Sequence, residues 1–391
     1  MKKLLAIPND PTSAYFRSSR EDFLGEFNPK YDGSRRFDEV RFLNWRDEKD
    51  TSFQGVDSKA FLKDKSLVEK LYRGLTNLEI PFDSEEGSFS ALFEVEADLV
   101  RKFVSEYNPD LIRAFNTHFA VELGILARRY SGAPLMVSGH DPTRLTPAIA
   151  GVDAMVCESY ELRNLCLEEF GVNPQDISVI HNGIDLDFFS PRSTSSIAEY
   201  VPAEFLDAPY KVFSSSRLVK GKNIETLMKS LALVKDELPG LVHLHLGAAG
   251  SQPEKAAEIM DLRGELGLES TSHFLGAKQK KELPFYYSWA DVFVLPTLWE
   301  GLSRVMRESL AWGTPLITTN YGSSAEIVQT GFNGVGVDPM NEEEIAEAIL
   351  ETLKDDIFRK KLSNNSRPSV EKYSLPLSME LYSKLYAELS R

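Results

Sequence analysis

The 391-residue chain has little cysteine: Cys157 and Cys166 are the only two. Two cysteines without the paired spacing of a zinc site exclude a disulfide framework and favour a reducing, cytoplasmic environment. Long apolar runs are also missing. No stretch approaches the roughly 20 residues of a membrane span, and the run after Lys3 has only about five residues, too few for a signal peptide. We therefore expect a cytoplasmic protein whose membrane contact, if it has any, is peripheral at the inner membrane face.

Clusters of basic residues are absent as well. The 44 lysines and arginines stand against 59 aspartates and glutamates, which gives a net charge of −15. A diffuse negative field repels a phosphate backbone, so we exclude a nucleic-acid partner. The chain has no Walker-type Gly-Lys-Ser/Thr loop, and Gly334-Val335-Gly336 lacks the third glycine of a dinucleotide fingerprint, which disfavours ATP hydrolysis and NAD chemistry. Residues 16–55 mix arginines with acidic side chains, and this balance favours a solvated insertion over an anion-binding site.

Short apolar runs alternate with helix-period segments along most of the chain, which is typical of βα units and a parallel sheet. The expected strands form two series, 4–8, 111–115, 135–138, 154–157 and 177–180, and then 211–215, 241–247, 291–296 and 315–319. We predict an α/β protein of two domains, 1–190 and 207–372. Residues 191–206 lose the pattern and are expected to connect them, and residues 373–391 are expected to end the chain as a helix.

The expected strand 291–296 runs into a turn that carries Glu300 and then into a helix from about residue 304. Ligands bind beyond the carboxyl ends of parallel strands, where a helix start offers N–H groups to an anion. The backbone of residues 301–303 is therefore a candidate donor of hydrogen bonds. Glu308 lies about one helical turn further on, and its carboxylate suits the vicinal hydroxyls of a ribose.

A second cluster follows the expected strand 211–215. Arg217 and Lys222 flank one strand-to-helix loop. A guanidinium and an ammonium at a helix start suit a diphosphate whose charge grows as it leaves. Basic residues in such loops are more often only solvated, so this cluster gains weight from the segment with Glu300 and Glu308.

These residues resemble the retaining glycosyltransferases of family 4. The resemblance rests on Glu300 and Glu308 with seven residues between them, on the Arg217/Lys222 pair, and on segments in the family's order. The segments are 181–185 (His-Asn-Gly-Ile-Asp), 274–276 (Phe-Leu-Gly), 287–296, 308–315 and 331–334. The resemblance implies a GT-B fold, in which two Rossmann-like parallel-sheet domains face a central cleft. It also implies an acceptor-binding first domain, a nucleotide-sugar-binding second domain and a C-terminal helix that crosses back to the first.

The resemblance assigns roles to individual residues. It implies a diphosphate site at Arg217 and Lys222, a sugar contact at Glu300 and a ribose contact at Glu308. It implies that His140 touches the donor sugar near the reacting carbon and that Lys278 lies in the loop that holds the base. The other donor-side candidates are Gly301, Leu302, Ser303 and Arg304, and the acceptor-side candidates are His118 and Asp141.

Some positions keep a plainer alternative. Arg304 is more simply explained by an i,i+4 pair with Glu308 than by an acidic group on the donor. His118 serves a helix start as readily as an acceptor cleft. The alternating His243 and His245 favour a packed, hydrogen-bonded pair over metal ligands. Asp185-Leu186-Asp187 is not expected to bind metal. The segment 8–14 lacks the Gly-Gly pair common in the family, which leaves the acceptor side open.

The expected activity is retaining transfer of a hexose-type sugar to an acceptor hydroxyl, with a UDP- or GDP-linked sugar as the favoured donor. The acceptor is a glycan, a lipid-linked or a small molecule. His140, Glu300, Arg217 and Lys222 would be the catalytic residues. No metal or cofactor is expected, because Arg217 and Lys222 supply the positive charge. The alternatives are a nucleotide-sugar hydrolase or epimerase that uses Glu300 and Glu308 as paired carboxylates, and a donor-binding module without transfer activity.

Overall fold

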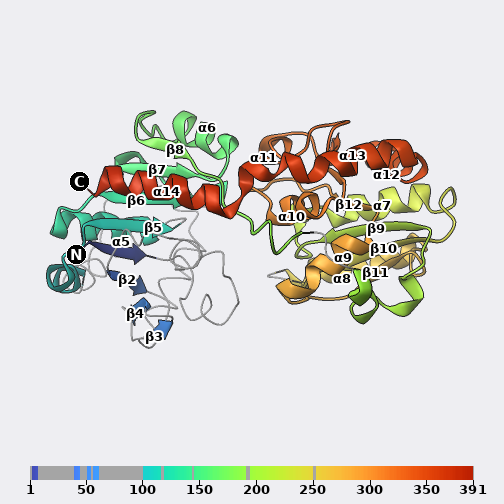
Figure 1. The fold of residues 1–391 in the computed structure, drawn as a ribbon, viewed down its shortest axis with the longest axis horizontal. Coiled ribbons are helices and arrows are strands. Elements are labelled where there is room, and N and C mark those ends of the chain that lie inside the picture. Colours follow the sequence, from blue (N-terminus) through green and yellow to red (C-terminus); the bar gives the residue numbers. More distant parts are fainter. Residues whose placement is uncertain are drawn as a thin grey trace. The chain divides into compact units, whose positions relative to one another are not determined.

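The computed structural model describes residues 2–7, 39–44, 51–53, 56–60, 100–115, 119–142, 145–190, 194–249 and 252–390 (Figure 1). The chain divides into two compact units. The first unit comprises Met1–His181 with Ser378–Arg391, and the second unit comprises Asn182–Leu377. Each unit is built around one sheet, so the expectation of two α/β domains with parallel sheets is confirmed.

The first unit has an eight-stranded sheet in the order β3-β4-β2-β1-β5-β6-β7-β8. Its strands are β1 (Lys3–Ile7), β2 (Glu39–Asn44), β3 (Thr51–Phe53), β4 (Val56–Ala60), β5 (Leu111–Phe115), β6 (Leu135–Gly139), β7 (Ala154–Cys157) and β8 (Ile177–Val179). All neighbours pair in parallel except β3, which is antiparallel to β4. β1, β5, β6, β7 and β8 confirm the predicted first series of strands. The solvated insertion expected at 16–55 is wrong where β2 and β3 lie, because both strands belong to the sheet.

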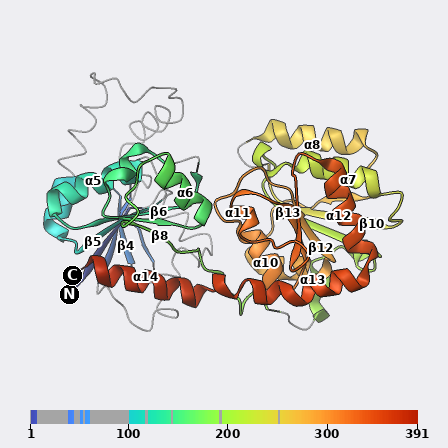
Figure 2. The ribbon, with the colours of Figure 1, turned by 90° about the horizontal axis from the view of Figure 1, so that it is seen from above.

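Helices cover both faces of this first sheet. They are a helical stretch at 100–107, α5 (Phe119–Ser131), α6 (Tyr160–Glu168) and α14 (Leu375–Leu389), with a 3-10 turn η2 (Pro147–Gly151). Figure 2 shows α5 and α6 on one face of the sheet and α14 on the other. Tyr382 and Tyr386 of α14 are buried together with Leu4, Leu111 and Met136 of the strands. The C-terminal helix thus packs on the first unit, as predicted.

The second unit has a six-stranded, fully parallel sheet in the order β11-β10-β9-β12-β13-β14. Its strands are β9 (Tyr210–Ser215), β10 (Leu241–Leu246), β11 (Ser272–Phe274), β12 (Val292–Leu295), β13 (Leu316–Thr319) and β14 (Gly334–Val337). β9, β10, β12 and β13 confirm the predicted second series. Every residue of β12 is buried, because helices cover both faces of the sheet.

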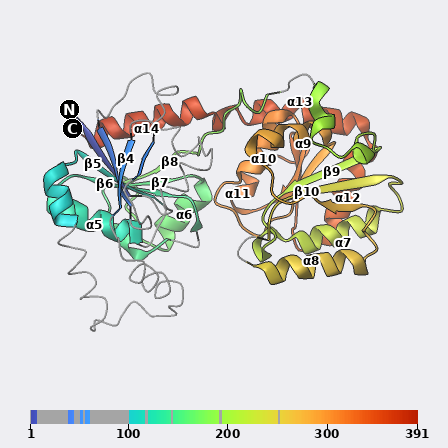
Figure 3. The ribbon, with the colours of Figure 1, turned by 90° about the horizontal axis from the view of Figure 1, so that it is seen from below.

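The helices of the second unit are α7 (Ile224–Val234), α8 (Pro253–Glu265), α9 (Leu283–Trp289), α10 (Arg304–Trp312), α11 (Gly322–Ala325), α12 (Glu342–Lys354) and α13 (Asp356–Ser369), with short 3-10 turns η5 (Lys220–Lys222), η6 (Lys280–Glu282) and η7 (Glu371–Tyr373). Figure 3 shows α7 and α8 on one face of the sheet and α9 and α10 on the other. One apolar face of α7 recurs with the period of a helix and is buried, and it consists of Ile224, Leu227, Met228, Leu231 and Val234.

The segment expected to connect the domains, 191–206, lies inside the second unit from residue 194 on. It forms the 3-10 turns η3 (Thr194–Glu199) and η4 (Ala203–Phe205). Val201 is buried in the core, and the Tyr286 hydroxyl donates to the Tyr200 carbonyl at 2.7 Å. Apolar anchors within a Ser- and Pro-rich stretch therefore hold this segment, and the division falls earlier, between His181 and Asn182.

None of the helices in the described part of the chain is long and apolar enough to cross a membrane.

Candidate functional site

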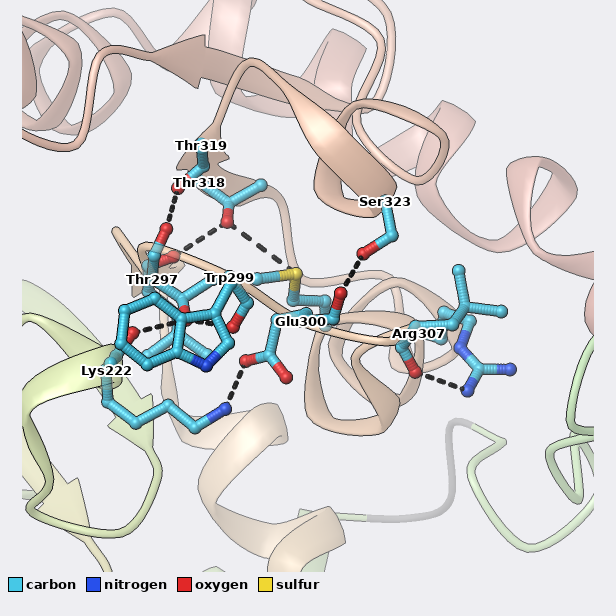
Figure 4. Close-up of polar contacts among 12 residues, drawn as sticks. Lys222, Thr297, Trp299, Glu300, Arg307, Thr318, Thr319 and Ser323 are labelled. Carbon is cyan, nitrogen blue, oxygen red and sulfur yellow. Dashed lines mark hydrogen bonds and ion pairs between the residues drawn. The ribbon is translucent and has the colours of Figure 1, made fainter. Parts of the chain in front are cut away.

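Loops at the carboxyl ends of β9, β12 and β13 are tied together. These strands are neighbours in the sheet, so their loops meet at one edge. The Gly221 carbonyl accepts hydrogen bonds from the Leu298 backbone N–H and the Thr297 hydroxyl, both at 2.9 Å. The Ser323 hydroxyl donates to the Glu300 carbonyl at 2.8 Å (Figure 4). The turn that carries Glu300 is thereby fixed from two sides.

Gly221 is required at the contact between two of these loops. A Cβ atom at Gly221 would lie 2.6 Å from the indole ring of Trp299, which belongs to the loop after β12. Trp299 itself is 50% exposed. An aromatic side chain thus borders the site, where sequence reasoning had assigned it no role.

Lys222 and Glu300, two of the predicted residues, lie in contact. Lys222 Nζ is 2.5 Å from Glu300 Oε1, and both side chains are largely buried (Figure 4). They come from loops 78 residues apart in sequence. The structure therefore brings together a cation and a carboxylate that were predicted to serve the same ligand.

Asn223 supports this pair and was missed by the sequence reasoning. Its backbone is left-handed, with φ of 54°, a conformation that asparagine tolerates better than most residues. Its amide nitrogen donates to the carbonyls of Pro296 and Pro339, at 3.0 and 2.6 Å, and its Oδ1 accepts from the Thr226 hydroxyl. The side chain thus joins the loops after β12 and β14 to the start of α7.

The remaining donor-side candidates differ in exposure. Arg217, Lys278 and Arg304 are exposed. Leu302 and Ser303 are buried at the start of α10, and the Ser303 hydroxyl makes no capping hydrogen bond there. The first N–H groups of an α-helix have no partner within the helix, which makes the backbone at the start of α10 a candidate donor to a ligand.

Glu308 is more enclosed than the sequence suggests, with 2% exposure. The Tyr287 hydroxyl donates to Glu308 Oε2 at 3.1 Å and also lies 3.2 Å from the Val305 carbonyl. Burial and the neighbouring carboxylate raise the pKa of Tyr287 well above its ordinary value, so the phenol remains a donor. One oxygen of Glu308 is thus already engaged by a residue that the sequence reasoning overlooked.

A buried arginine lies behind the same turn. Arg307 is 1% exposed, and its guanidinium donates to the carbonyls of Leu302 at 3.0 Å and Ser303 at 3.1 Å. A third bond goes to the Asn182 carbonyl. The spacing of the two glutamates gave no signal for this residue, because it lies on the opposite side of the helix start.

The two alternating histidines form a buried polar chain, as predicted. Ser272 Oγ lies 2.8 Å from His243 Nδ1, and Ser214 Oγ lies 2.7 Å from both His243 Nε2 and His245 Nδ1. His245 Nε2 donates to the Ser216 carbonyl at 3.1 Å. Burial lowers the pKa of His245 to about 4 and that of His243 well below its usual value. The chain thus consists of neutral groups and ends on the residue before Arg217.

In the first unit, His140 follows β6 and faces a carboxylate. His140 Nδ1 lies 3.3 Å from Glu158 Oε2, and His181 Nδ1 lies 2.8 Å from the Glu158 carbonyl. Glu158 was not singled out from the sequence, although it follows β7 directly. Asp141 is half-buried. The acceptor candidate His118 and the segment 8–14 lie outside the described residues.

Two family models match most of the chain. The model "Glycosyltransferase Family 4" matches residues 75–188, and "Glycosyl transferases group 1" matches residues 199–368. Spore coat protein SA of Bacillus subtilis is 29% identical over 49% of this chain and 53% of its own length. The D-inositol 3-phosphate glycosyltransferase of Streptomyces bingchenggensis is 25% identical over 62% of this chain and 54% of its own length. The chain spans about half the length of these curated relatives.

Solved structures share the whole fold. HepE of Anabaena, crystallised with UDP and glucose, is 20% identical with a TM-score of 0.74, over 99% of this chain and all of its own. Sucrose-phosphate synthase of Thermosynechococcus elongatus is 19% identical with a TM-score of 0.76, over 100% of this chain and 99% of its own. At this level of identity the likeness establishes the fold, which is the GT-B arrangement expected from the sequence.

Proposed function

This chain belongs to the family 4 glycosyltransferases, and on that premise we propose that it transfers a hexose-type sugar from a nucleoside diphosphate sugar to an acceptor hydroxyl, with retention of the anomeric configuration. The observation that carries the proposal is the Lys222–Glu300 pair beside the start of α10. The cation suits a departing diphosphate, the carboxylate accepts hydrogen bonds from sugar hydroxyls, and the helix start supplies N–H donors. The phosphate and sugar parts of a donor thus find matching groups in one loop cluster.

The nucleotide half of the donor is assigned to the second unit. Arg217 and Lys222 take the diphosphate, and the loop with Lys278 takes the base. Glu308 takes the ribose, and its bond with Tyr287 orients the carboxylate before a nucleotide arrives. Because Tyr287 occupies one oxygen of the Glu308 carboxylate, we expect Glu308 to accept one strong hydrogen bond from the ribose through its other oxygen. The strength of this bond should depend on the orientation that Tyr287 gives the carboxylate.

The leaving diphosphate takes up the negative charge of the breaking bond and also acts as the base. Arg217 and Lys222 stabilise its growing negative charge, and one of its oxygens accepts the proton of the attacking hydroxyl on the same face of the sugar. Retention then requires no protein nucleophile. Glu300 positions the transferred sugar. His140 contacts the same sugar, and Glu158 accepts from its Nδ1–H and so fixes the ring.

A uridine nucleotide is the first donor to test, because HepE is crystallised with UDP and with UDP-glucose. The acceptor is a hydroxyl on a glycan, a lipid-linked or a small molecule. Inositol phosphates enter the acceptor screen because several relatives are inositol phosphate glycosyltransferases. We propose that no metal is required, since two basic side chains serve the diphosphate.

Calorimetric titration of UDP, GDP, ADP and CMP tests the donor site. One nucleotide should bind at micromolar strength to the wild type, and Arg217→Ala and Glu308→Ala should each weaken it at least about tenfold. Unchanged affinity in both folded variants, or no binding to the wild type, would contradict the donor site. With the matching nucleotide sugar, product analysis by NMR must show an α-linked product from an α-linked donor. Free sugar at a similar rate would indicate a hydrolase, and a new nucleotide sugar without acceptor would indicate an epimerase.

A further inference from the structure

The turn before α10 has its carbonyl groups drawn to one side by Arg307. The guanidinium donates to the carbonyls of Leu302 and Ser303, at 3.0 and 3.1 Å, and is 1% exposed. Figure 4 shows the Arg307 side chain on the far side of the turn from Lys222. Glu300 thus contacts Lys222, on the side of the proposed ligand, whereas Leu302 and Ser303 contact Arg307 on the opposite side of the turn.

Because a peptide group is planar, the hydrogen bonds from Arg307 also set the direction of the neighbouring N–H groups. A trans peptide is planar, so its C=O and its N–H point in opposite directions, and the described residues contain no cis peptide. When Arg307 holds the carbonyl of Leu302, the N–H of Ser303 points away from the guanidinium. When it holds the carbonyl of Ser303, the N–H of Arg304 does the same. These two N–H groups belong to the N-cap residue and the first residue of α10.

The same guanidinium is anchored to two hydrogen-bonded segments of the second unit. It donates to the Asn182 carbonyl and lies 5.4 Å from the ring centroid of Tyr373. The segments around these residues pair with each other, because Ile184 N–H donates to the Tyr373 carbonyl and Leu375 N–H to the Ile184 carbonyl, each at 2.9 Å. Arg307 thus has a fixed reference from which to hold the turn.

We propose that Arg307 is a positioning residue for the donor diphosphate: it orients the N–H groups of Ser303 and Arg304 toward the phosphate without touching the ligand. The inference rests on the proposed function. A buried positive charge at this helix end also adds to the attraction of the helix dipole for an anion. The orienting role requires the fork of the guanidinium, because a lysine ammonium is a single point charge.

Arg367 offers a matched control. Its guanidinium also donates to three carbonyls of the second unit, those of Phe189 at 3.2 Å, Ala311 at 2.8 Å and Leu186 at 3.1 Å. Ala311 belongs to the last turn of α10, at the end remote from the proposed ligand. Arg307 and Arg367 thus tie the two ends of one helix, and only the former tie faces the donor site.

The experiment compares UDP with UMP in calorimetric titrations of the wild type, Arg307→Met, Arg307→Lys and Arg367→Met, with thermal unfolding of each. Arg307→Met should weaken UDP binding about tenfold or more and UMP binding much less, because UDP carries the additional phosphate. Arg307→Lys should resemble Arg307→Met, since it keeps the charge and loses the fork. Arg367→Met should lower the unfolding temperature and leave the ratio of UDP to UMP affinity unchanged.

Each outcome is decisive. A wild-type UDP:UMP affinity ratio in Arg307→Met overturns the positioning role while the proposed function stands. A wild-type UDP:UMP affinity ratio in Arg307→Lys would show that the positive charge alone is sufficient, and it overturns the orienting role of the guanidinium. An equal loss in Arg367→Met shows a general structural effect and also overturns the proposal. If Arg307→Met does not fold, Arg307→Lys carries the comparison. A wild type that binds GDP in place of UDP carries the same comparison with GDP and GMP, and a wild type that binds none of UDP, GDP, ADP and CMP overturns the proposed function itself.

Discussion

Acidification is expected to destabilise the second unit through His245. The folded protein holds this side chain neutral, with its pKa lowered by burial from 6.5 to about 4. Below pH 6.5 the unfolded chain binds a proton that the folded chain refuses. The free energy of unfolding therefore falls as the pH decreases from about 6.5 to about 4, and it is fully retained above that window. His243, whose pKa is lowered in the same direction, adds to the fall.

The magnitude follows from the shift. One pKa unit corresponds to about 1.4 kcal/mol, so the lowered pKa of His245 corresponds to about 3 kcal/mol lost by pH 4. The polar chain explains why protonation is resisted. His245 Nε2 donates to the Ser216 carbonyl, so the neutral ring accepts from Ser214 at Nδ1. A proton on His245 Nδ1 would turn this acceptor into a donor, so the buried Ser214 hydroxyl would lose the acceptor of its own hydrogen.

Urea unfolding at pH 4.5, 5.5, 6.5 and 7.5 measures this dependence. Tryptophan fluorescence suits the second unit, which holds Trp289, Trp299 and Trp312, three of the four tryptophans. The wild type should lose stability steadily below pH 6.5, and His245→Gln should show a slope smaller by about one proton, although it starts from a lower stability at pH 7.5. Equal slopes in the two proteins, or a wild type equally stable at pH 4.5 and 7.5, would refute the reasoning.

Four further outcomes are expected. Lys222→Met should lower turnover about 100-fold or more, because the cation proposed to face the leaving group is lost, whereas Lys220→Met, an exposed neighbour in the same loop, should leave turnover within about twofold. Tyr287→Phe should raise the KM for the nucleotide sugar about fivefold with little change in kcat, because the variant lacks the hydroxyl that orients the Glu308 carboxylate. Gly183→Ala should lower the unfolding temperature strongly, as its Cβ would meet backbone at 2.4 Å, whereas Gly151→Ala, with nothing within 4 Å, should not. Treatment with EDTA should leave the transfer rate unchanged, and a loss restored by a divalent cation would contradict the proposed role of the basic residues.

The sheets were predictable where burial on both faces makes a strand uniformly apolar. β12, Val-Phe-Val-Leu, is such a strand and was located correctly. β2 was not, because Glu39-Val-Arg-Phe-Leu-Asn carries charges and lies in a segment rich in both signs. The turns η3 and η4 were hidden in the same way, since Ser and Pro dominate the composition while a few apolar residues supply the anchors.

The site was predictable where function depends on spacing along the chain, and unpredictable where it depends on pairing across the sheet. Glu300 and Lys222 were identified from their loops, but their contact follows from the adjacency of β9 and β12. The histidines alternate visibly, whereas their link through Ser214 requires the register that sets it opposite His245. Asn223 donates to the Pro339 carbonyl, 116 residues away, and no local sequence pattern predicts such a partner.

Several side chains behind the loops of the second unit share one task, and it bears on how a chain with a net charge of −15 would present the proposed site to an anionic donor. Four carbonyls at the loop edge are each held by a side chain of the same unit: Ser216 by a histidine, Glu300 by a serine, and Leu302 and Ser303 by an arginine. Because every trans peptide sets its N–H opposite its C=O, holding these carbonyls turns the following N–H groups the other way. Together with the proposed diphosphate residues Arg217 and Lys222, such oriented backbone dipoles would favour an anion locally, in spite of the negative charge of the chain as a whole. Surface carboxylates should accordingly slow the encounter with a nucleotide sugar at low salt without weakening the bound state, and raising the ionic strength should increase kon with little change in koff in stopped-flow binding.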